Sequence, residues 1–273
     1  MTQQLINTDE IVTELDISHL TLPSAHEYVS EDDTPVDNLQ SEKQQRLLVE
    51  PLYSSRPIPA PFLAAANVGL FYILKGDPIV PDMMLSLGVQ CADDFSQREN
   101  RAYFVWEFGK LPEVCIEIVS NKEGDELTLS SKSKQKGKTT AKKDLYAQIR
   151  IPYYVVFDPL RQIQTKPDMN QALLRVWSNS AGRYIELTPT QGINDVGQVV
   201  WLEEVGLGLT LWSGQFEEDI TRVWLRWCDR TGQVIPTGAE RAETERLRAE
   251  TERQRAERLA EKLRSLGVDP DQI

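Results

Sequence analysis

The stretch LPEVCIEIVS (residues 111–120) decides the fold of this chain together with two segments that follow it. Its residues alternate between the two faces of a predicted strand, and Glu117 is a charged residue inside the apolar run VCIEIV. TTAKKDLYAQI (139–149) predicts a helix from its apolar spacing, and YYVVFDP (153–159) predicts a second, buried strand. A strand, a helix and an apolar strand in this order are typical of a crossover unit with parallel strands.

Further strands are predicted on both sides of this unit. VGLFYIL (68–74) and MMLSLGV (83–89) each predict a strand bounded by turn residues. Residues 173–213 hold several short β-like stretches, from which we expect a small antiparallel extension of the sheet. We therefore predict an α/β (α+β) fold class, in which a mixed sheet is flanked by helices.

The chain divides into three predicted parts. Residues 1–44 are polar and acid-rich, which indicates a mobile leader, and residues 45–235 form the folded domain. Residues 236–273 form a long charged C-terminal helix, because residues 239–266 repeat every seven positions (RAETERL, RAETERQ, RAERLAE). A seam recurs along this helix at Ala242, Ala249, Ala256 and Leu263. Because the seam is mostly alanine, a solvated single helix and a coiled coil that makes a homodimer both stay open.

Composition excludes several classes of chemistry and disfavours others. The only histidines are His19 and His26, far from the predicted strands, which argues against zinc sites and Ser–His–Asp triads. The net charge of −12 disfavours a general DNA binder, although residues 132–143 form a local basic patch. The lysines of this patch are Lys132, Lys134, Lys136, Lys138, Lys142 and Lys143.

Localisation follows from cysteine usage and hydropathy. The three cysteines are widely spaced and form no C-x-x-C pair, as is usual in a reducing compartment. The N-terminus lacks a signal-peptide pattern, and no apolar stretch approaches the ~18–20 residues of a membrane helix. We expect a cytoplasmic protein without a membrane partner.

Three residues are candidates for chemistry. Glu117 lies inside an apolar strand, where a carboxylate is costly unless it is paired or metal-bound, or unless that face of the sheet is open to solvent. Asp82 follows Pro81 before a strand, and could equally be a turn residue. Lys142 lies on the helix predicted over 139–149, one residue before Lys143, and could be a surface lysine. Two carboxylates from adjacent strands can hold Mg²⁺ or Mn²⁺, and a nearby lysine can stabilise charge on a phosphate.

The pattern as a whole resembles the Uma2 family of endonucleases, of the cyanobacterial type, which is similar to the PD-(D/E)XK restriction-endonuclease-like superfamily. The resemblance is carried by DDTPVDN (32–38), IVPDMMLSLGV (79–89), VWE (105–107), EIVSNKEG (117–124), KKDLYAQI (142–149), YYVVFDP (153–159), EEVGLGLTLW (203–212), LRWCD (225–229) and IPTGAERAE (235–243). It covers nearly the whole chain beyond about residue 20. It implies a restriction-endonuclease-like fold and metal-dependent hydrolysis of DNA.

The resemblance also implies roles for individual residues. It makes Asp82, Glu117 and Lys142 the catalytic residues, and it makes Asp82, Glu117 and the backbone carbonyl of Ile118 the ligands of Mg²⁺ or Mn²⁺. The superfamily usually has a lysine two residues after the glutamate, where this chain has Val119. The lysine four residues before the helix tyrosine Tyr146 is the natural replacement, although Lys143 stays an alternative.

Two features depart from the family pattern. Residues 127–141 form a longer link between strand and helix than is usual, so they are either a basic loop that grips DNA or an unstructured insertion. An acid from the first helix often joins such sites, and Glu42 and Glu50 are both candidates. Three functions stay open: a metal-dependent endonuclease, a degenerate nuclease fold that serves as an assembly module, and a nucleic-acid binder without catalysis.

Overall fold

A mixed six-stranded sheet lies at the centre of the computed structural model, which describes residues 38–74, 76–129, 139–266 and 269. Its strands follow the order β1-β3-β5-β6-β7-β8. Their bounds are β1 Phe62–Ala65, β3 Met83–Leu87, β5 Val114–Ile118, β6 Tyr153–Phe157, β7 Leu174–Ser180 and β8 Arg183–Glu186. β5 and β6 pair in parallel, whereas the other pairs are antiparallel. The predicted mixed sheet is therefore confirmed.

The crossover between β5 and β6 contains helix α4 (Lys142–Gln148), as the strand–helix–strand pattern predicts. The parallel register places Glu117 opposite Val156 and Ile118 opposite Phe157. All five residues of β5 and all five of β6 are buried, which matches the near-continuous apolar runs that covered parallel strands require. The predicted helix is confirmed within 139–149, although it begins only at Lys142.

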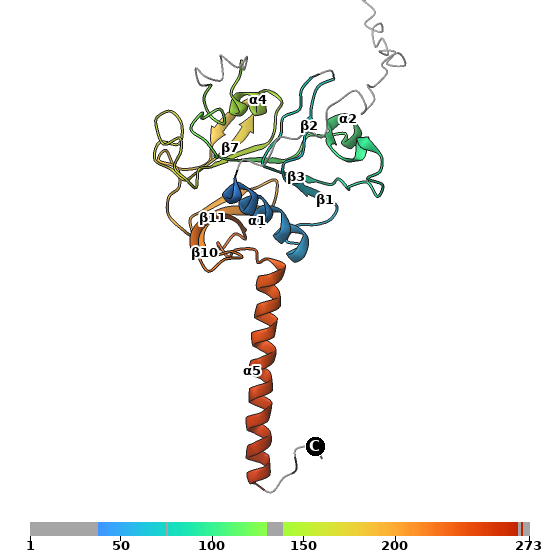
Figure 1. The fold of residues 1–273 in the computed structure, drawn as a ribbon, viewed down its shortest axis with the longest axis vertical. Coiled ribbons are helices and arrows are strands. Elements are labelled where there is room, and N and C mark those ends of the chain that lie inside the picture. The colour runs from blue at the N-terminus through green and yellow to red at the C-terminus, as the bar shows by residue number, and fades with distance from the viewer. Residues whose placement is uncertain (1–37, 75, 130–138, 267–268, 270–273) are drawn as a thin grey trace, which may run out of the picture.

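The two faces of the central sheet are covered by different elements (Figure 1). On one face, Ile116 and Ile118 belong to an apolar cluster that includes Leu48 of helix α1 (Leu39–Ser55). On the other face, Cys115 belongs to a second cluster with Tyr146 of α4. The strand period of two decides this division, because successive side chains of β5 point to opposite faces.

A second antiparallel sheet, β11-β10-β9, covers α1 and the first face. Its strands are β9 Val199–Leu202, β10 Leu207–Gln215 and β11 Thr221–Cys228. The prediction that residues 173–213 extend the central sheet is therefore right for β7 and β8 and wrong for β9 and β10. The reason is that β10 pairs on one edge with β11, from Gly208 opposite Cys228 to Gln215 opposite Thr221, and on the other edge with β9, from Leu207 opposite Leu202 to Thr210 opposite Val199.

The segment 68–74 forms a shorter strand than its apolar run predicts. β2 spans only Leu70–Phe71 and pairs in parallel with β4 (Tyr103–Phe104) in a sheet of its own. The short helices η2 (Arg98–Asn100) and α2 (Val105–Phe108) flank β4. The ring of Phe71 stacks on that of Phe104 at a centroid distance of 4.6 Å, so the apolar residues pack beside the central sheet instead of extending it.

Helix α1 begins inside the predicted leader. The side chain of Asn38 accepts a hydrogen bond from Ser41 N (2.9 Å) and caps the helix. Buried Gln44 exchanges two hydrogen bonds with the backbone of Leu225, at 2.8 and 3.0 Å. Residues 39–44 therefore belong to a helix that packs on the domain through Ser41 and Gln44, which corrects the predicted leader boundary. Residues 1–37 lie outside the described residues.

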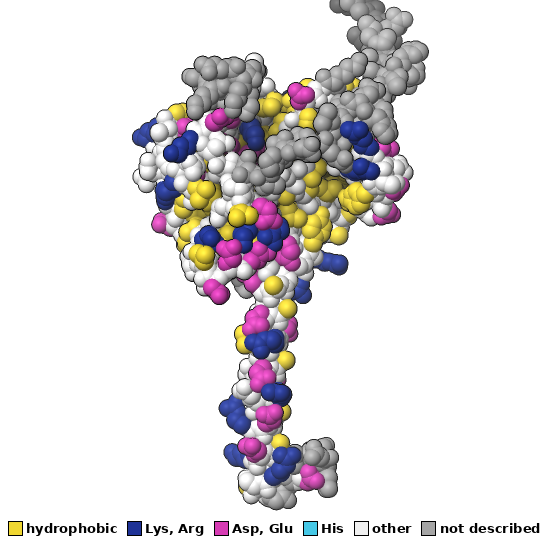
Figure 2. Space-filling view, in the orientation of Figure 1, with side chains coloured by type: hydrophobic (Ala, Val, Ile, Leu, Met, Phe, Trp, Pro, Cys, Tyr) yellow, Lys and Arg dark blue, Asp and Glu magenta, His cyan; other side chains and the backbone are white. Residues whose placement is uncertain are grey.

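The long C-terminal helix α5 (Gly238–Ser265) is confirmed and projects from the rest of the molecule (Figures 1 and 2). A reciprocal capping box joins Thr237 and Glu240 at its start. Buried Arg226 donates to both carboxylate oxygens of Glu240, at 3.1 and 2.7 Å. No residue of α5 is buried. Within the described ranges, no helix combines the length and the apolar character that crossing a membrane requires.

Candidate active site

Asp82 lies where three elements meet. It directly precedes β3, and the last ladder pair of β3 with β5 is Met83 opposite Ile116. Beyond that pair, Asp82 Oδ2 accepts a hydrogen bond from the backbone N–H of Ile118 (2.6 Å). Oδ1 accepts a second bond from Gln45 Nε2 of α1 (2.9 Å). The carboxylate therefore ties the start of β3 to the end of β5 and to α1, and it does more than terminate a turn.

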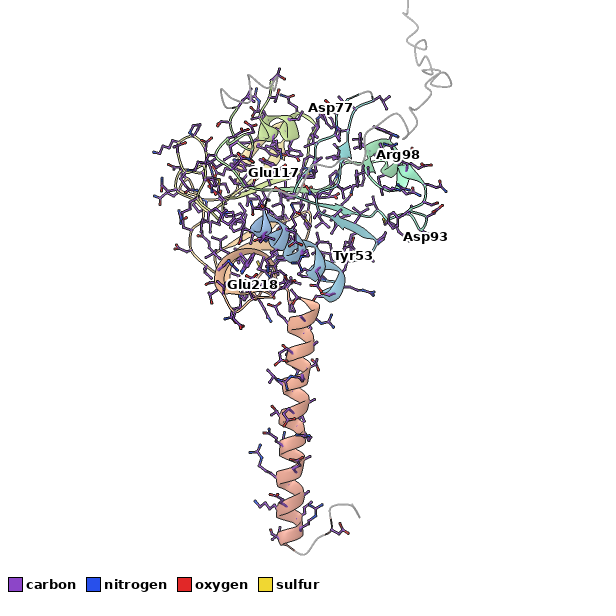
Figure 3. All side chains as sticks on the ribbon, in the orientation of Figure 1. Tyr53, Asp77, Asp93, Arg98, Glu117 and Glu218 are labelled. Carbon is purple, nitrogen blue, oxygen red and sulfur yellow. The ribbon has the colours of Figure 1, made fainter. Side chains whose placement is uncertain are left out.

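Glu117 is buried within the domain, with 1% of its surface exposed (Figure 3). Its Oε2 accepts a hydrogen bond from Lys142 Nζ (2.6 Å), and its Oε1 accepts one from Tyr146 Oη (2.8 Å). Burial raises the pKa of this carboxyl to about 8 against the opposing charge of Lys142, and the charge of Asp82 adds to the rise. The alternative of a solvent-exposed face is wrong, because α4 covers this face of the sheet.

Helix α4 decides between the two candidate lysines. Lys142 and Tyr146 are four residues apart, so they share one face of the helix and both reach Glu117. Lys143 points elsewhere, with its Nζ 4.5 Å from the centroid of the Trp177 ring. Burial lowers the pKa of Lys142, but the charges of Glu117, Asp82 and Glu126 together raise it above its ordinary value.

The backbone of Ile118 also faces the site. The N–H and C=O of a strand residue point to the same side, as the paired bonds of a sheet ladder require. Because the N–H of Ile118 donates to Asp82, its carbonyl lies on the side of Asp82 as well. The structure thus brings together Asp82, Glu117, Lys142 and Ile118, all four of the predicted residues.

Neither acid that the sequence offered from the first helix reaches this site. Glu42 forms an ion pair with Arg46, and Glu50 accepts a hydrogen bond from Gly238 N (3.0 Å). Gln45 occupies the place next to Asp82 instead. The helical period explains this result, because Gln45 lies on the buried face of α1 whereas Glu42 and Glu50 lie on more exposed faces.

Glu126 is an acid of the site that the sequence analysis missed. Its side chain is 8% exposed, and its Oε2 has no hydrogen-bond partner among the described residues. Its backbone carbonyl accepts bonds from Lys143 N (3.1 Å) and Tyr154 Oη (2.7 Å). The pair Asp125–Glu126 was the available signal, but residues 127–141 separate it from Lys142 in the sequence.

Two backbone hydrogen bonds hold the start of the long link between β5 and α4 against the first turn of α4. Lys142 N donates to Asp125 O (2.9 Å), just as Lys143 N donates to Glu126 O (3.1 Å). These carbonyls satisfy N–H groups in the first turn of α4, where Ala141 provides no side-chain cap. The lysines at positions 132, 134, 136 and 138 lie outside the described residues.

The carboxylates of the site are close enough to influence one another but do not form a closed metal cage. In the part of the chain that the structure describes, no group of three or more His, Cys, Asp or Glu side chains could hold a metal ion. A cation here would therefore need backbone oxygen and water beside two carboxylates. The unpartnered Oε2 of Glu126 is a buried acceptor that fits such hydrated chemistry.

No family model matches the sequence, and no curated protein matches it. The resemblance to the Uma2 family stays a prediction, and the function has to be argued from the site.

Proposed function

We propose that this chain is a metal-dependent endonuclease that hydrolyses phosphodiester bonds of DNA, as its resemblance to the Uma2 family implies. The observation that supports this most directly is the buried Glu117–Lys142 pair beside Asp82. A fully buried carboxylate costs stability, so a strand that served packing alone would carry an apolar residue at this position. Carboxyls whose pKa is strongly raised beside a specific charged partner are typical of functional sites.

Oxygen ligands are available for a hard cation. Asp82, Glu117 and the backbone carbonyl of Ile118 would hold Mg²⁺ or Mn²⁺, since both ions prefer oxygen. Bound there, the cation would polarise a phosphate oxygen and lower the pKa of a coordinated water. Waters would complete the coordination shell, because the described residues supply no third side chain of a metal-binding group.

Lys142 would act on the substrate, and Tyr146 would act by holding Glu117 in position. The Lys142 side chain is 33% exposed whereas Glu117 is buried, so Lys142 is the member of the pair that DNA could reach. There it would stabilise negative charge on the phosphate in the transition state. Tyr146 would keep Oε1 of Glu117 in position through its 2.8 Å hydrogen bond.

DNA is the proposed partner because of the resemblance and the lysine-rich link. Both described ends of this link lie beside Lys142, through the bonds of residues 142 and 143 to residues 125 and 126. A basic segment attached there would offset locally the net charge of −12 that disfavours DNA binding elsewhere on the chain.

The proposed activity is tested by nicking of supercoiled plasmid in the presence of Mg²⁺, Mn²⁺ or EDTA, with cation binding measured by calorimetry on the same protein. We expect nicked plasmid with either cation, no product in EDTA, and a binding isotherm for each cation. A protein that binds neither cation and leaves the plasmid intact would contradict the proposal.

A second candidate function is that of an assembly module that acts through α5. The observation that favours it is a helix of 28 residues without one buried residue, held firmly at its base (Figure 2). Arg226 binds Glu240, and Glu50 accepts a bond from Gly238 N. A long arm without a buried residue is available to a partner, and a second copy of this chain is the partner that the seven-residue repeat would fit, through a coiled coil.

Removal of residues 242–273 is expected to lower the oligomeric mass without unfolding the domain. The truncated chain keeps Glu240 and Arg241, so Arg226 keeps its carboxylate partner and the bond of Arg241 to the Ser54 carbonyl remains. Light scattering coupled to gel filtration would show a dimer for the full chain and a monomer for the truncated one. If the full chain and the truncated chain were both monomers, the coiled coil would be contradicted.

A further inference from the structure

Glu126 has a buried carboxylate that accepts a hydrogen bond from its own backbone N–H but whose Oε2 has no partner among the described residues. Its side chain is 8% exposed, and Oε2 is a buried atom with no hydrogen bond from the described residues. Buried acceptors are almost always satisfied, and each exception needs an explanation. Protonation alone would not provide one, because a protonated Oε2 would become a buried donor without an acceptor.

The backbone of Glu126 is held independently of its carboxylate. A turn at Gly124, whose carbonyl accepts bonds from Leu127 N and Thr128 N (both 3.0 Å), precedes the α4 contacts. The carbonyl of Glu126 then accepts bonds from Lys143 N and Tyr154 Oη. The position is therefore fixed by main-chain contacts, so the carboxylate is not needed to build the turn.

The charged neighbours of Glu126 are the residues of the candidate site. Burial raises the pKa of Glu126, the charge of Lys142 lowers it, and the charges of Asp125 and Asp82 raise it further. Glu126 in turn contributes to the raised pKa of Glu117. The backbone bond from Lys143 N to the carbonyl of Glu126 places this residue beside the first turn of α4, where Lys142 lies.

We infer that the free Oε2 of Glu126 accepts hydrogen bonds from water bound to a divalent cation that Asp82 and Glu117 hold. This inference rests on the proposed function and adds a positioning residue to the same site. A direct ligand role is disfavoured, because the described residues contain no three such side chains gathered for metal binding. Mg²⁺ commonly keeps several of its waters in protein sites, and carboxylates that hold such outer ligands tune affinity.

Calorimetric titration of Mg²⁺ into the full chain and its Glu126→Gln variant tests this inference. Glutamine keeps the size of the side chain but removes the negative charge and one acceptor, so we expect Mg²⁺ affinity to fall about 10- to 100-fold. Glu123→Gln is the matched control, since it makes the same charge change three residues away in the same loop, and it should bind within about twofold of the parent.

A Glu117→Gln variant separates the two ways in which this experiment can fail. If the parent binds Mg²⁺, Glu117→Gln abolishes binding and Glu126→Gln binds like the parent, the role of Glu126 is refuted while the proposed function stands. If the parent binds no divalent cation, both are refuted. Far-ultraviolet circular dichroism and urea unfolding establish that each variant is folded, and Glu126→Asp, which keeps the charge on a shorter side chain, should bind Mg²⁺ better than Glu126→Gln does.

Discussion

A Glu117→Gln variant is expected to lose metal-dependent cleavage and, in metal-free buffer, to become more stable relative to the parent as the pH rises. The pKa of Glu117 is raised to about 8 in the folded chain, mainly by burial, against an ordinary value of 4.5. Between these values the folded chain holds a proton that the unfolded chain has lost. The parent's free energy of unfolding therefore falls as the pH increases from about 4.5 to about 8.

Glutamine removes this pH dependence because it has no proton to lose. In the parent, the charge of Glu117 and its hydrogen bond help to raise the pKa of Lys142 above its ordinary value against the effect of burial. Between pH 5 and pH 8 the parent should lose a few kcal/mol of stability relative to Glu117→Gln, given about 1.4 kcal/mol per unit of pKa shift. The amide can still accept the hydrogen bond from Tyr146.

Urea unfolding at pH 5, 6.5 and 8 in EDTA measures the first effect, and plasmid nicking with Mn²⁺ measures the second. Parallel stability profiles of parent and variant would contradict the raised pKa of Glu117. Undiminished nicking by Glu117→Gln would contradict its role as a cation ligand. Because the two readouts are separate, loss of cleavage in a more stable protein cannot be attributed to unfolding.

Lys142→Ala is expected to slow cleavage by about 10²- to 10³-fold, the usual consequence of removing one group that stabilises transition-state charge. Lys142 Nζ is 2.6 Å from Glu117 Oε2, and a third of its side chain faces solvent. Alanine also favours the helix, so α4 itself should persist.

Lys143→Ala provides the matched control in the same turn of α4. Its ammonium lies 4.5 Å from the ring centroid of Trp177, away from Glu117, so cleavage should stay within about twofold of the parent. Its stability should fall by about 0.5–1 kcal/mol through loss of the cation–π contact. Equal losses of activity in both variants would show that the lysines act through general charge and not through a positioned ammonium.

Much of this site was predictable because its parts lie on regular elements. The alternation of β5 predicts that Glu117 lies on the face opposite Ile116 and Ile118, and the structure confirms this. The four-residue spacing of Lys142 and Tyr146 predicts a shared helix face, and both reach Glu117. Periods of 2 and 3.6 residues hold wherever the backbone is regular, so local spacing carries over into space.

Other features could not be predicted because they depend on contacts between residues far apart in the sequence, which local patterns do not reveal. Glu126 lies beside the first turn of α4 because its carbonyl accepts a backbone hydrogen bond from Lys143 N across the long link between β5 and α4. β10 leaves the central sheet because β11, a segment with no clear strand prediction, pairs along it. The folded domain begins before residue 45, where it was predicted to start, because Gln44 of α1 exchanges hydrogen bonds with the backbone of Leu225, 181 residues away.

By itself, the sequence determined the mixed fold, the parallel β5–β6 unit and the long C-terminal helix, since each depends on local periodicity and polarity. Only the tertiary structure showed that Lys142 and not Lys143 contacts Glu117, and that Gln45 of α1 contacts Asp82 where Glu42 and Glu50 do not. It also revealed Glu126 as a further buried acid. The physical reason is that local pattern fixes the direction of a side chain on its own element. Which carboxylates lose solvent and which gain a partner depends on how distant elements close around them.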